Sequence, residues 1–421
     1  MQKLSPQSEW IARAQQVLPA GGFGNFDPGI IIARGEGSRV WDEDGKEYVD
    51  YLIGSGPMLL GHGHPEVMEA IFEQLPKGMT FFANNAKGVE LAEAIIDAVP
   101  CCEQVRFVNS GGEADMYAIR LARAYAGKDK VLKFEGGYHG MSAEAQMSLA
   151  PEIHVNFPQA VPDSAGIPQG VADQILIAPF NDLAAVEALL HEHKDIAAII
   201  TEPLQRIIPA DPGFLQGLRD LCDKHHVLLI FDEIVTGFRL AYGGAQERYG
   251  VTPDICTLGK IIGGGFPLAA LGASKEIMAH FDKTATDKWL MQLGTLSGNP
   301  IAAAAGLKTM EILARDGAYD TLREIGQTLQ TMINDALQGA DIPHQICGDE
   351  TLFDVYFTDK TCRDYRSAKH DDPQRNTLFN QVLRDSGIFK SPGKLYPSLA
   401  IMQADLQITE AALNSAVSAL S

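Results

Sequence analysis

The chain has 421 residues, of which 46% are hydrophobic and 8% aromatic, enough for a large core in two or three domains or one large domain. Its 34 basic and 54 acidic residues give a net charge of −20, which argues against nucleic acid or an anionic membrane surface as the main partner. Six scattered cysteines without a C-x-x-C pair favour reduced thiols in the cytoplasm. No stretch resembles a signal peptide or approaches the roughly 20 apolar residues of a membrane span, so we expect a soluble cytoplasmic protein.

The N-terminal part predicts a helix and then a hairpin. Residues 8–18 have an amphipathic pattern that Pro19-Ala-Gly-Gly22 would end. Residues 39–51 read as two short strands around an Asp-Gly turn. His62 and His64 follow in a glycine-rich loop, and because no third ligand with usable spacing is nearby, turn residues are a better interpretation than a metal site.

From residue 65 to about residue 300, predicted helices and strands alternate. We expect helices at 65–75, 87–98, 113–126, 182–191, 213–225 and 274–280, and strands at 104–108, 130–134, 174–178, 195–201, 227–232, 255–258 and 268–272. The proline-rich stretch 142–173 lacks periodicity and is expected to be a surface excursion near the site. The alternation favours a mostly parallel sheet with helices on both faces.

The C-terminal part is predicted to be helical at first and then mixed. A long helix to about residue 314 would follow Gly298-Asn-Pro300, and a second helix is expected at 319–338. The tail at 407–420 is amphipathic, and no linker or internal repeat separates it from the rest. The expected organisation is an N-terminal segment of a small domain, a large domain, and the C-terminal part of the small domain, at 1–64, 65–300 and 301–421.

One buried strand is predicted to end in acidic side chains. The run 228–231 is solidly apolar, and Asp232 and Glu233 follow it, at the end of the strand where open α/β sheets bind ligands. Adjacent strand residues point to opposite faces, so these two acids are a poor match for the paired carboxylates of a glycosidase. One of them would face the pocket, where a carboxylate can keep a pyridine nitrogen protonated. An ordinary salt bridge is the alternative.

A lysine follows the neighbouring apolar strand. Lys260 comes after residues 255–258 and before the glycines 263–265. A desolvated lysine has a depressed pKa and is suited to Schiff-base chemistry, whereas surface charge is the ordinary alternative. The stretch is no Walker A loop, since Asp254 stands where the first glycine belongs, and no dinucleotide fingerprint is present, which counts against a dehydrogenase.

Two further segments add groups for a flat, phosphorylated ligand. The turn Asn109-Ser-Gly-Gly-Glu113 would open a helix with free N–H groups and a positive dipole end, which suits a phosphate, although such turns are also common structural joints. Tyr138 and His139 follow strand 130–134 and could supply a ring that stacks on a cofactor, with core packing as the alternative. Together with the acid and the lysine, they suggest a site for a cationic ring nitrogen and an imine.

Six ordered runs resemble the class III aminotransferases, the fold-type I enzymes that use pyridoxal 5'-phosphate. The chain is most similar to their glutamate-1-semialdehyde aminomutase branch. The runs are Asn109–Ala114, Ala118–Arg123, Lys133–Gly140, Phe231–Arg239, Thr257–Gly265 and Gly294–Pro300. The resemblance implies an α/β fold with a large domain, whose mostly parallel sheet is flanked by helices, and a smaller α+β domain made from both termini.

The resemblance also implies roles for single residues. Lys260 would form the Schiff base with the cofactor and shuttle the proton, and Asp232 would pair with the pyridinium nitrogen. Tyr138 would stack on one ring face and Ile234 would pack on the other. Thr295 would reach the phosphate of the neighbouring subunit, which implies a homodimer with shared active sites. The full set of implied cofactor residues is Ser110, Gly111, Gly112, Tyr138, His139, Glu202, Asp232, Ile234, Lys260 and Thr295.

The chain departs from the aminomutase branch mainly in its substrate pocket. Ser55 stands where that branch commonly has Trp, and residues 391–400 lack its active-site glutamate. One departure concerns the cofactor, since Gly112 replaces the usual Thr. We therefore expect a ping-pong aminotransferase that moves an amino group between an amino acid and a 2-oxo acid. The alternative is the aminomutase, which gives 5-aminolevulinate.

The substrate side of the site is only outlined by the sequence. Arg206 and Lys394 are candidates to bind a substrate carboxylate, although surface charge is an ordinary reading of each. The small Ser55 would admit a bulky amino acid or a β-amino acid. A non-catalytic cofactor-binding regulator is a third hypothesis, against which stand the presence of Lys260 and the absence of a basic patch.

Overall fold

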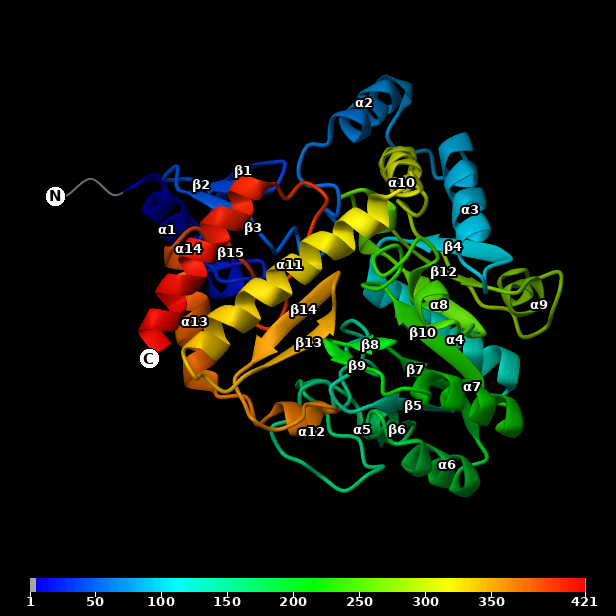
Figure 1. Ribbon diagram of the computed structural model, residues 1–421. Helices are drawn as coiled ribbons and strands as arrows, with labels where there is room; N and C mark the ends of the chain where they lie inside the picture. Colours follow the sequence, from blue (N-terminus) through cyan, green and yellow to red (C-terminus); the bar gives the residue numbers. More distant parts are fainter. Residues whose placement is uncertain (1–4, 421) are drawn as a thin grey trace.

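The computed structural model describes residues 5–420; residues 1–4 of the expected N-terminal segment and Ser421 lie outside the described residues. Its centre is a seven-stranded sheet (Figure 1). The strands, from one edge to the other, are β4 (Gln104–Val108), β12 (Ala269–Ala273), β11 (Ile255–Leu258), β10 (Leu228–Glu233), β7 (Ile196–Thr201), β5 (Lys130–Phe134) and β6 (Ile175–Ala178). Only β12 runs antiparallel to its neighbours in this sheet, so the predicted mostly parallel sheet is confirmed.

Helices cover both faces of this sheet. On one face, α4 (Gly111–Ala126) packs across the central strands, where its Ala118 and Ile119 meet Ile230 and Ile255. On the other face, the next residues along the same strands, among them Phe231 and Cys256, pack beneath a second group of helices. This group comprises α3 (Ala86–Ala98), α6 (Leu183–Glu192), α7 (Phe214–His225) and α10 (Pro300–Leu313). The alternation along each strand explains why both sheet faces are apolar.

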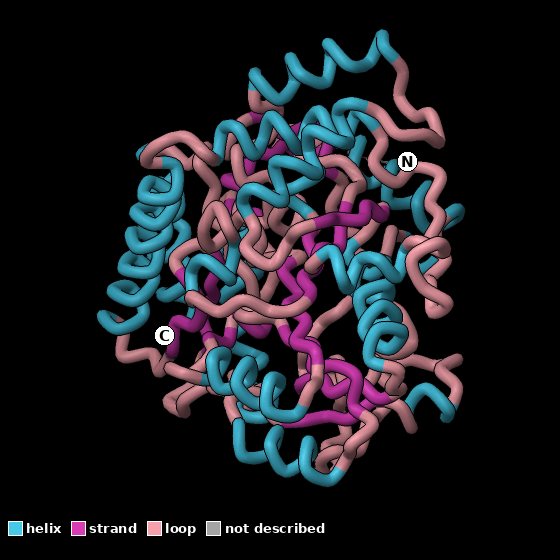
Figure 2. Tube along the Cα trace, turned by 90° about the vertical axis from the view of Figure 1, so that its right-hand side faces the viewer, coloured by secondary structure: helices cyan, strands magenta, loops and turns pink. Residues whose placement is uncertain are grey.

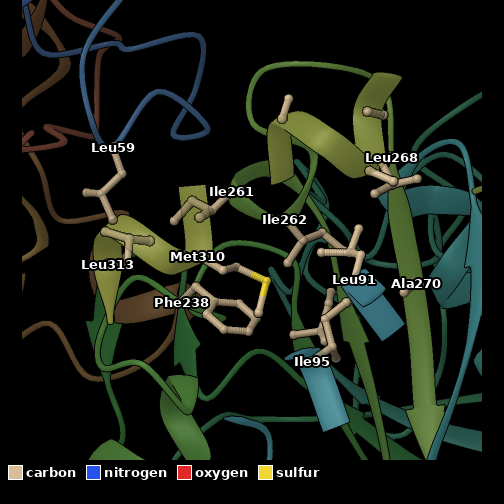
Figure 3. Close-up of a cluster of buried hydrophobic side chains, with 14 of the residues drawn as sticks. Leu59, Leu91, Ile95, Phe238, Ile261, Ile262, Leu268, Ala270, Met310 and Leu313 are labelled. Carbon is tan, nitrogen blue, oxygen red and sulfur yellow. The ribbon is translucent and has the colours of Figure 1, made fainter. Parts of the chain in front are cut away.

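The core cluster around the turn after β11 fixes the backbone beside Lys260. Figure 3 shows Ile261 and Ile262 among buried side chains from several segments, with the sulfur of Met310 close to the ring of Phe238. A Cβ on Gly306 of α10 would lie 1.9 Å from the carbonyl oxygen of Ile262, so only a glycine permits this approach. The 3₁₀ turn Lys260–Gly263 therefore rests directly on a buried helix.

Both ends of the described chain build a second layered region, and α1 (Pro6–Val17) and α14 (Gln403–Leu420) lie on the same side of the molecule in Figure 1. The predicted hairpin is present as β2 (Arg39–Asp42) and β3 (Glu47–Asp50), and β15 (Ile388–Phe389) pairs with β3 in parallel. Tyr51 is buried in one cluster with Phe353 and Leu413. We propose from this shared core that residues 5–64 and 301–420 form a smaller domain beside residues 65–300.

The remaining elements follow the predicted order with a few additions. The first helices are α1 (Pro6–Val17) and α2 (Pro65–Gln74), and the smaller region adds β1 (Ile32–Glu36), α11 (Ala318–Gly339), β13 (Gln345–Asp349), β14 (Leu352–Tyr356), α12 (Tyr365–Ala368), α13 (Pro373–Asp385) and α14 (Gln403–Leu420). Elements too short to be predicted are α5 (Gln169–Ala172), β8 (Leu204–Gln205), β9 (Ile208–Pro209) and α8 (Gly244–Tyr249). The helix predicted at 274–280 is a short helix, α9 (Lys275–Met278), followed by a 3₁₀ turn.

The rest of the chain runs in loops over this framework, as the tube in Figure 2 shows. The stretch predicted as an excursion at 142–173 is irregular except for α5. Within residues 5–420, no helix combines the length and the apolar character that crossing a membrane would require.

Candidate active site

The two carboxylates at the end of β10 point to opposite faces, as predicted. Asp232 is buried on the face of α4, where its Oδ2 lies 2.8 Å from Nδ1 of His139 and its Oδ1 accepts the N–H of Ile234 at 3.1 Å. Glu233 lies on the other face and accepts hydrogen bonds from the Ala245 N–H and from Nε2 of Gln246. Asp232 is therefore the acid available to a ligand, while Glu233 is bound within the core.

A third buried acid lies next to Asp232. Thr257 of β11 donates to Oδ1 of Asp115 at 2.7 Å, and its hydroxyl is 3.5 Å from Oδ1 of Asp232. Burial, and then the charge of Asp232, raise the pKa of Asp115 well above its usual value. Sequence reasoning missed Asp115, although an acid on the apolar face of α4, among Ala114 and Ala118, was a signal for it.

Lys260 follows the end of β11, the strand next to the one that carries Asp232. Its backbone has φ of 51°, a left-handed conformation that few residues other than glycine adopt. A Cβ on Gly56 would lie 3.4 Å from Cδ of Lys260 and 3.2 Å from the ring of Tyr396, so the lysine stem is enclosed by these neighbours. Burial lowers the pKa of Lys260, and its amine has no hydrogen-bond or ion-pair partner among residues 5–420. The geometry thus provides a desolvated, free amine.

The start of α4 forms a cradle of small residues. Ser110 is the N-cap, and its hydroxyl accepts the Glu113 N–H in a capping box, which leaves the hydroxyl proton free to donate. The N–H groups of Gly111 and Gly112 have no partner in the part of the chain that the structure describes. A Cβ on Gly111 would lie 2.9 Å from Cγ2 of Ile234, so backbone alone fits here. Free N–H groups at a helix N-terminus suit a phosphate.

Tyr138 stands at the entrance to this site. Its side chain is 38% exposed, and its N–H donates to Oε2 of the buried Glu202 at 2.9 Å. The guanidinium of Arg206 lies 5.3 Å from the centre of the Tyr138 ring. Burial, and then the charge of Arg206, lower the pKa of Lys394 to about 8. The structure therefore brings together Tyr138, Glu202, Arg206 and Lys394.

Ser55 and Thr295 are the remaining candidates from the sequence. Ser55 is an exposed loop residue with φ of 66°, and it directly precedes Gly56, where an added Cβ would come within 3.4 Å of Lys260. Thr295 is exposed on the loop before α10, and its carbonyl accepts the hydroxyl of Thr80. The exposure of Thr295 leaves it accessible to a second subunit.

The family model for aminotransferase class-III matches residues 24–420. The chain belongs to the class-III aminotransferases. It is 40% identical over 387 residues to glutamate-1-semialdehyde 2,1-aminomutase 2 of Brevibacillus brevis, and the match covers 90% of this chain and 89% of that relative. The predicted family, α/β fold of type I, enzymatic class and pyridoxal 5'-phosphate cofactor are thereby confirmed.

Solved structures of other aminotransferases share the whole fold. An omega-transaminase from Sphaerobacter thermophilus is 34% identical, with a TM-score of 0.93, and the match covers 99% of this chain and 98% of that one. A beta-phenylalanine aminotransferase from Variovorax paradoxus is 29% identical, with a TM-score of 0.86 over 98% of this chain and 93% of that one.

The residues of this aminotransferase fit its cofactor chemically. A buried carboxylate is available for a ring nitrogen, a free amine for an aldehyde, and a helix N-terminus for a phosphate. The acid is braced by His139, whose Nε2 is buried without a partner among the described residues. The donor set therefore agrees with the cofactor that the family uses.

A buried arginine that sequence reasoning missed holds the wall beside Lys260. Arg239 is completely buried and donates to the carbonyl oxygens of Gly56, Thr351 and Pro397. It has no carboxylate partner among the residues described, and burial lowers its pKa to about 10. Through these carbonyls it joins three segments that are distant in the sequence.

Two other buried charges support the strand that leads to Tyr138. Lys133 in β5 donates to the carbonyl of Ala145 at 2.6 Å, and burial lowers its pKa to about 7. Glu135 accepts two hydrogen bonds from Arg366 of α12, at 2.7 and 2.9 Å. These contacts fix the loop 142–148 and α12 on the large sheet, close to the cofactor residues.

Proposed function

We propose that this class-III enzyme is an intermolecular, ping-pong aminotransferase, which moves an amino group between an amino acid and a 2-oxo acid through Lys260. The observation that carries the proposal is the unpaired, partly buried amine of Lys260, which follows β11 next to the strand that ends in Asp232. When bound, pyridoxal phosphate supplies an electron sink for the substrate carbon. Lys260 would hold the cofactor between turnovers and, as a free amine during the reaction, would move the proton.

The observed geometry supports a role for each of the proposed cofactor residues. Asp232 would pair with the ring nitrogen of the cofactor, and the contacts with His139 and with the Ile234 N–H hold its carboxylate in place. The first turn of α4 would hold the phosphate through the N–H groups of Gly111 and Gly112 and the Ser110 hydroxyl. Tyr138 and Ile234 would pack on the two faces of the ring, and Glu202 fixes the Tyr138 backbone.

The charges at the entrance support a carboxylate substrate. Arg206 and Lys394 form no ion pair with a carboxylate within residues 5–420, so both cations remain available to an anion. The small side chain at position 55, where the aminomutase branch commonly has Trp, favours a bulky amino acid or a β-amino acid. The named substrate of the Variovorax relative, beta-phenylalanine, belongs to this chemical class.

The aminomutase remains a second candidate because the 40% identical relative carries that name. It requires a site that retains the intermediate diamine and returns the amino group to the same molecule. The absence of an acid in residues 391–400 and the serine at position 55 favour the intermolecular reaction.

We further propose a homodimer with shared active sites in the cytoplasm. Large apolar side chains are exposed on two segments that meet through the Thr80–Thr295 hydrogen bond. They are Phe72, Leu75, Met79, Phe81 and Phe82 on one segment and Trp289, Met291, Leu293 and Leu296 on the other. Such a surface is typical of an interface, and Thr295 within it would reach the partner's phosphate. Six free, buried thiols are consistent with a reducing compartment.

A half-reaction screen tests the function. Holoenzyme is mixed with α-amino acids, β-amino acids, amines or glutamate 1-semialdehyde, and the visible cofactor band and any released oxo acid are followed. We expect the band to be lost with release of a 2-oxo or 3-oxo acid, and its return after a 2-oxo acid is added. Formation of 5-aminolevulinate from the semialdehyde alone would establish the mutase instead.

A variant pair tests the role of Lys260. Lys260→Ala should abolish turnover while the protein stays folded, whereas Lys275→Ala, at an exposed lysine on α9, should leave turnover unchanged. Continued transamination by Lys260→Ala would overturn the proposed mechanism.

A further inference from the structure

Three thiols meet in the core on the sheet face opposite to Asp232. Cys256 belongs to β11, while Cys101 and Cys102 lie in the turn between α3 and β4. The Sγ of Cys102 is 3.5 Å from that of Cys256 and 4.0 Å from that of Cys101, and all three sulfurs lie within 4.8 Å of one another. The remaining three cysteines are elsewhere, so this is a local cluster.

These separations match a coordination sphere. At a metal–sulfur distance of about 2.3 Å, three thiolates around one ion have sulfurs about 4.0 Å apart in a plane and about 3.8 Å apart in a tetrahedron. The observed spacings of 3.5 and 4.0 Å straddle these values. The third separation, between Cys101 and Cys256, is within 4.8 Å, so all three lie within about 1 Å of the values for a three-thiolate site.

The backbone makes room for the cluster at one position. Cys256 pairs with Gly272 of β12, and a Cβ on Gly272 would lie 2.2 Å from Sγ of Cys102. Any other residue at position 272 would displace that sulfur from Cys256. The missing side chain thus creates the space in which the thiols converge.

The surroundings lack a compensating positive charge. Gln246 accepts the Cys101 N–H and donates to Glu233, so the polar groups next to the cluster are an amide and a carboxyl. No lysine or arginine hydrogen-bonds to these sulfurs in the part of the chain that the structure describes. Anionic thiolates here would need a cation, and soft thiolates select thiophilic d¹⁰ ions.

We propose that Cys101, Cys102 and Cys256 form a binding site for one thiophilic cation such as Zn²⁺ or Cd²⁺, separate from the aminotransferase site. Binding replaces three S–H bonds with three metal–sulfur bonds and releases three protons to solvent, with no change in oxidation state. The cation enters through the turn, where Pro100 and Glu103 are exposed and Cys101 is 9% exposed. Once bound, it fastens the α3–β4 turn to the strand that ends beside Lys260.

Cadmium is the probe, because its thiolate complexes have a charge-transfer band in the ultraviolet. Holoenzyme in a phosphine reductant is titrated with Cd²⁺, and the band and the proton release are measured together. We expect saturation near one equivalent, with about three protons released per ion. Iodoacetamide labelling followed by mass spectrometry should show protection of the three cluster thiols and unchanged labelling of Cys222.

Variants test whether the cluster cysteines are the ligands. Cys256→Ser should weaken Cd²⁺ binding at least about tenfold, as expected when one of three ligands is lost, while Cys222→Ser, at a buried thiol elsewhere, should bind like the wild type. Retention of the visible cofactor band shows that each variant is folded. If Cys256→Ser does not fold, the proton count and the labelling pattern of the wild type decide.

Three results would overturn the proposal. The first is Cd²⁺ binding without a thiolate band. The second is binding that His191→Ala abolishes, because Glu187, His191 and His225 form a surface cluster that could also hold an ion. The third is a mass loss of two hydrogens reversed by the phosphine, which would identify a disulfide rather than a metal site.

Discussion

The contact between Gly140 and Gly112 gives a sharp test of the phosphate cradle. Gly140 has φ of 84°, and a Cβ there would lie 2.4 Å from Cα of Gly112, an atom of the backbone that cannot rotate away. Gly140→Ala must therefore move the first turn of α4 or the loop that carries Tyr138. Both displacements disturb groups that we assign to the cofactor.

The magnitude follows from two separate costs. A left-handed conformation costs an alanine about 1–3 kcal/mol, and overpacking against backbone costs about 1–3 kcal/mol more. Gly166 is a matched control, since its φ is 85° and nothing lies within 4 Å of a Cβ built there. Gly166→Ala should show the first cost alone, and Gly140→Ala should show both.

Two measurements separate stability from cofactor binding. Urea unfolding of the two apoproteins should give a free-energy difference of about 1–3 kcal/mol between them. The dissociation constant for pyridoxal phosphate, from the visible band, should rise at least about tenfold in Gly140→Ala and stay unchanged in Gly166→Ala. Equal behaviour of the two variants in both measurements would refute the argument that this contact positions the cradle.

Three other substitutions probe buried charges. Arg366→Met leaves the buried Glu135 unpaired and should lower the free energy of unfolding by up to about 3 kcal/mol, toward the lower end because Arg366 is 35% exposed. Lys308→Ala, in an exposed ion pair, should lower it by less than about 1 kcal/mol. Equal urea midpoints for the two variants would contradict this. Burial lowers the pKa of Lys133 to about 7, so between about pH 7 and 10.5 the unfolded chain binds a proton that the folded chain lacks, and folding stability rises with pH. Lys133→Met should flatten this rise of the unfolding temperature with pH. An unchanged slope would be inconsistent with the lowered pKa. Lys394, with a pKa of about 8, is charged below that pH, so KM for a carboxylate substrate should rise above pH 8. Lys394→Gln should have a high KM at all pH values, without that rise. Identical profiles of KM against pH for the wild type and the variant would remove Lys394 from the substrate site.

Much of the framework was predictable because the periodicity of apolar residues within each segment indicates a helix or a strand. The alternating helices and strands between residues 65 and 300 and the Asp-Gly hairpin appear where their patterns place them. The opposite orientation of Asp232 and Glu233 followed from strand geometry alone. The family roles of the site residues came from ordered motifs rather than from any single residue.

What the sequence did not reveal depends on contacts between distant segments. The insertion of β12 between β4 and β11 requires pairing that no local pattern encodes. Cys102 and Cys256 are 154 positions apart, and only the sheet brings them together. Arg239 looks like any charged residue after a turn, and its complete burial depends on carbonyls supplied by the N- and C-terminal parts. Asp115 was readable in principle, as an acid on an apolar helix face.

The bonds of Arg239 also bear on how the enzyme matures during synthesis. Its guanidinium joins Gly56, 183 positions earlier, with Pro397, 158 positions later. The wall beside Lys260 therefore cannot close until residue 397 has left the ribosome, long after the strand carrying Asp232 is available to pair. Nascent chains should lack this wall, so a truncation before residue 397 would leave the Lys260 amine exposed to solvent and to free aldehydes.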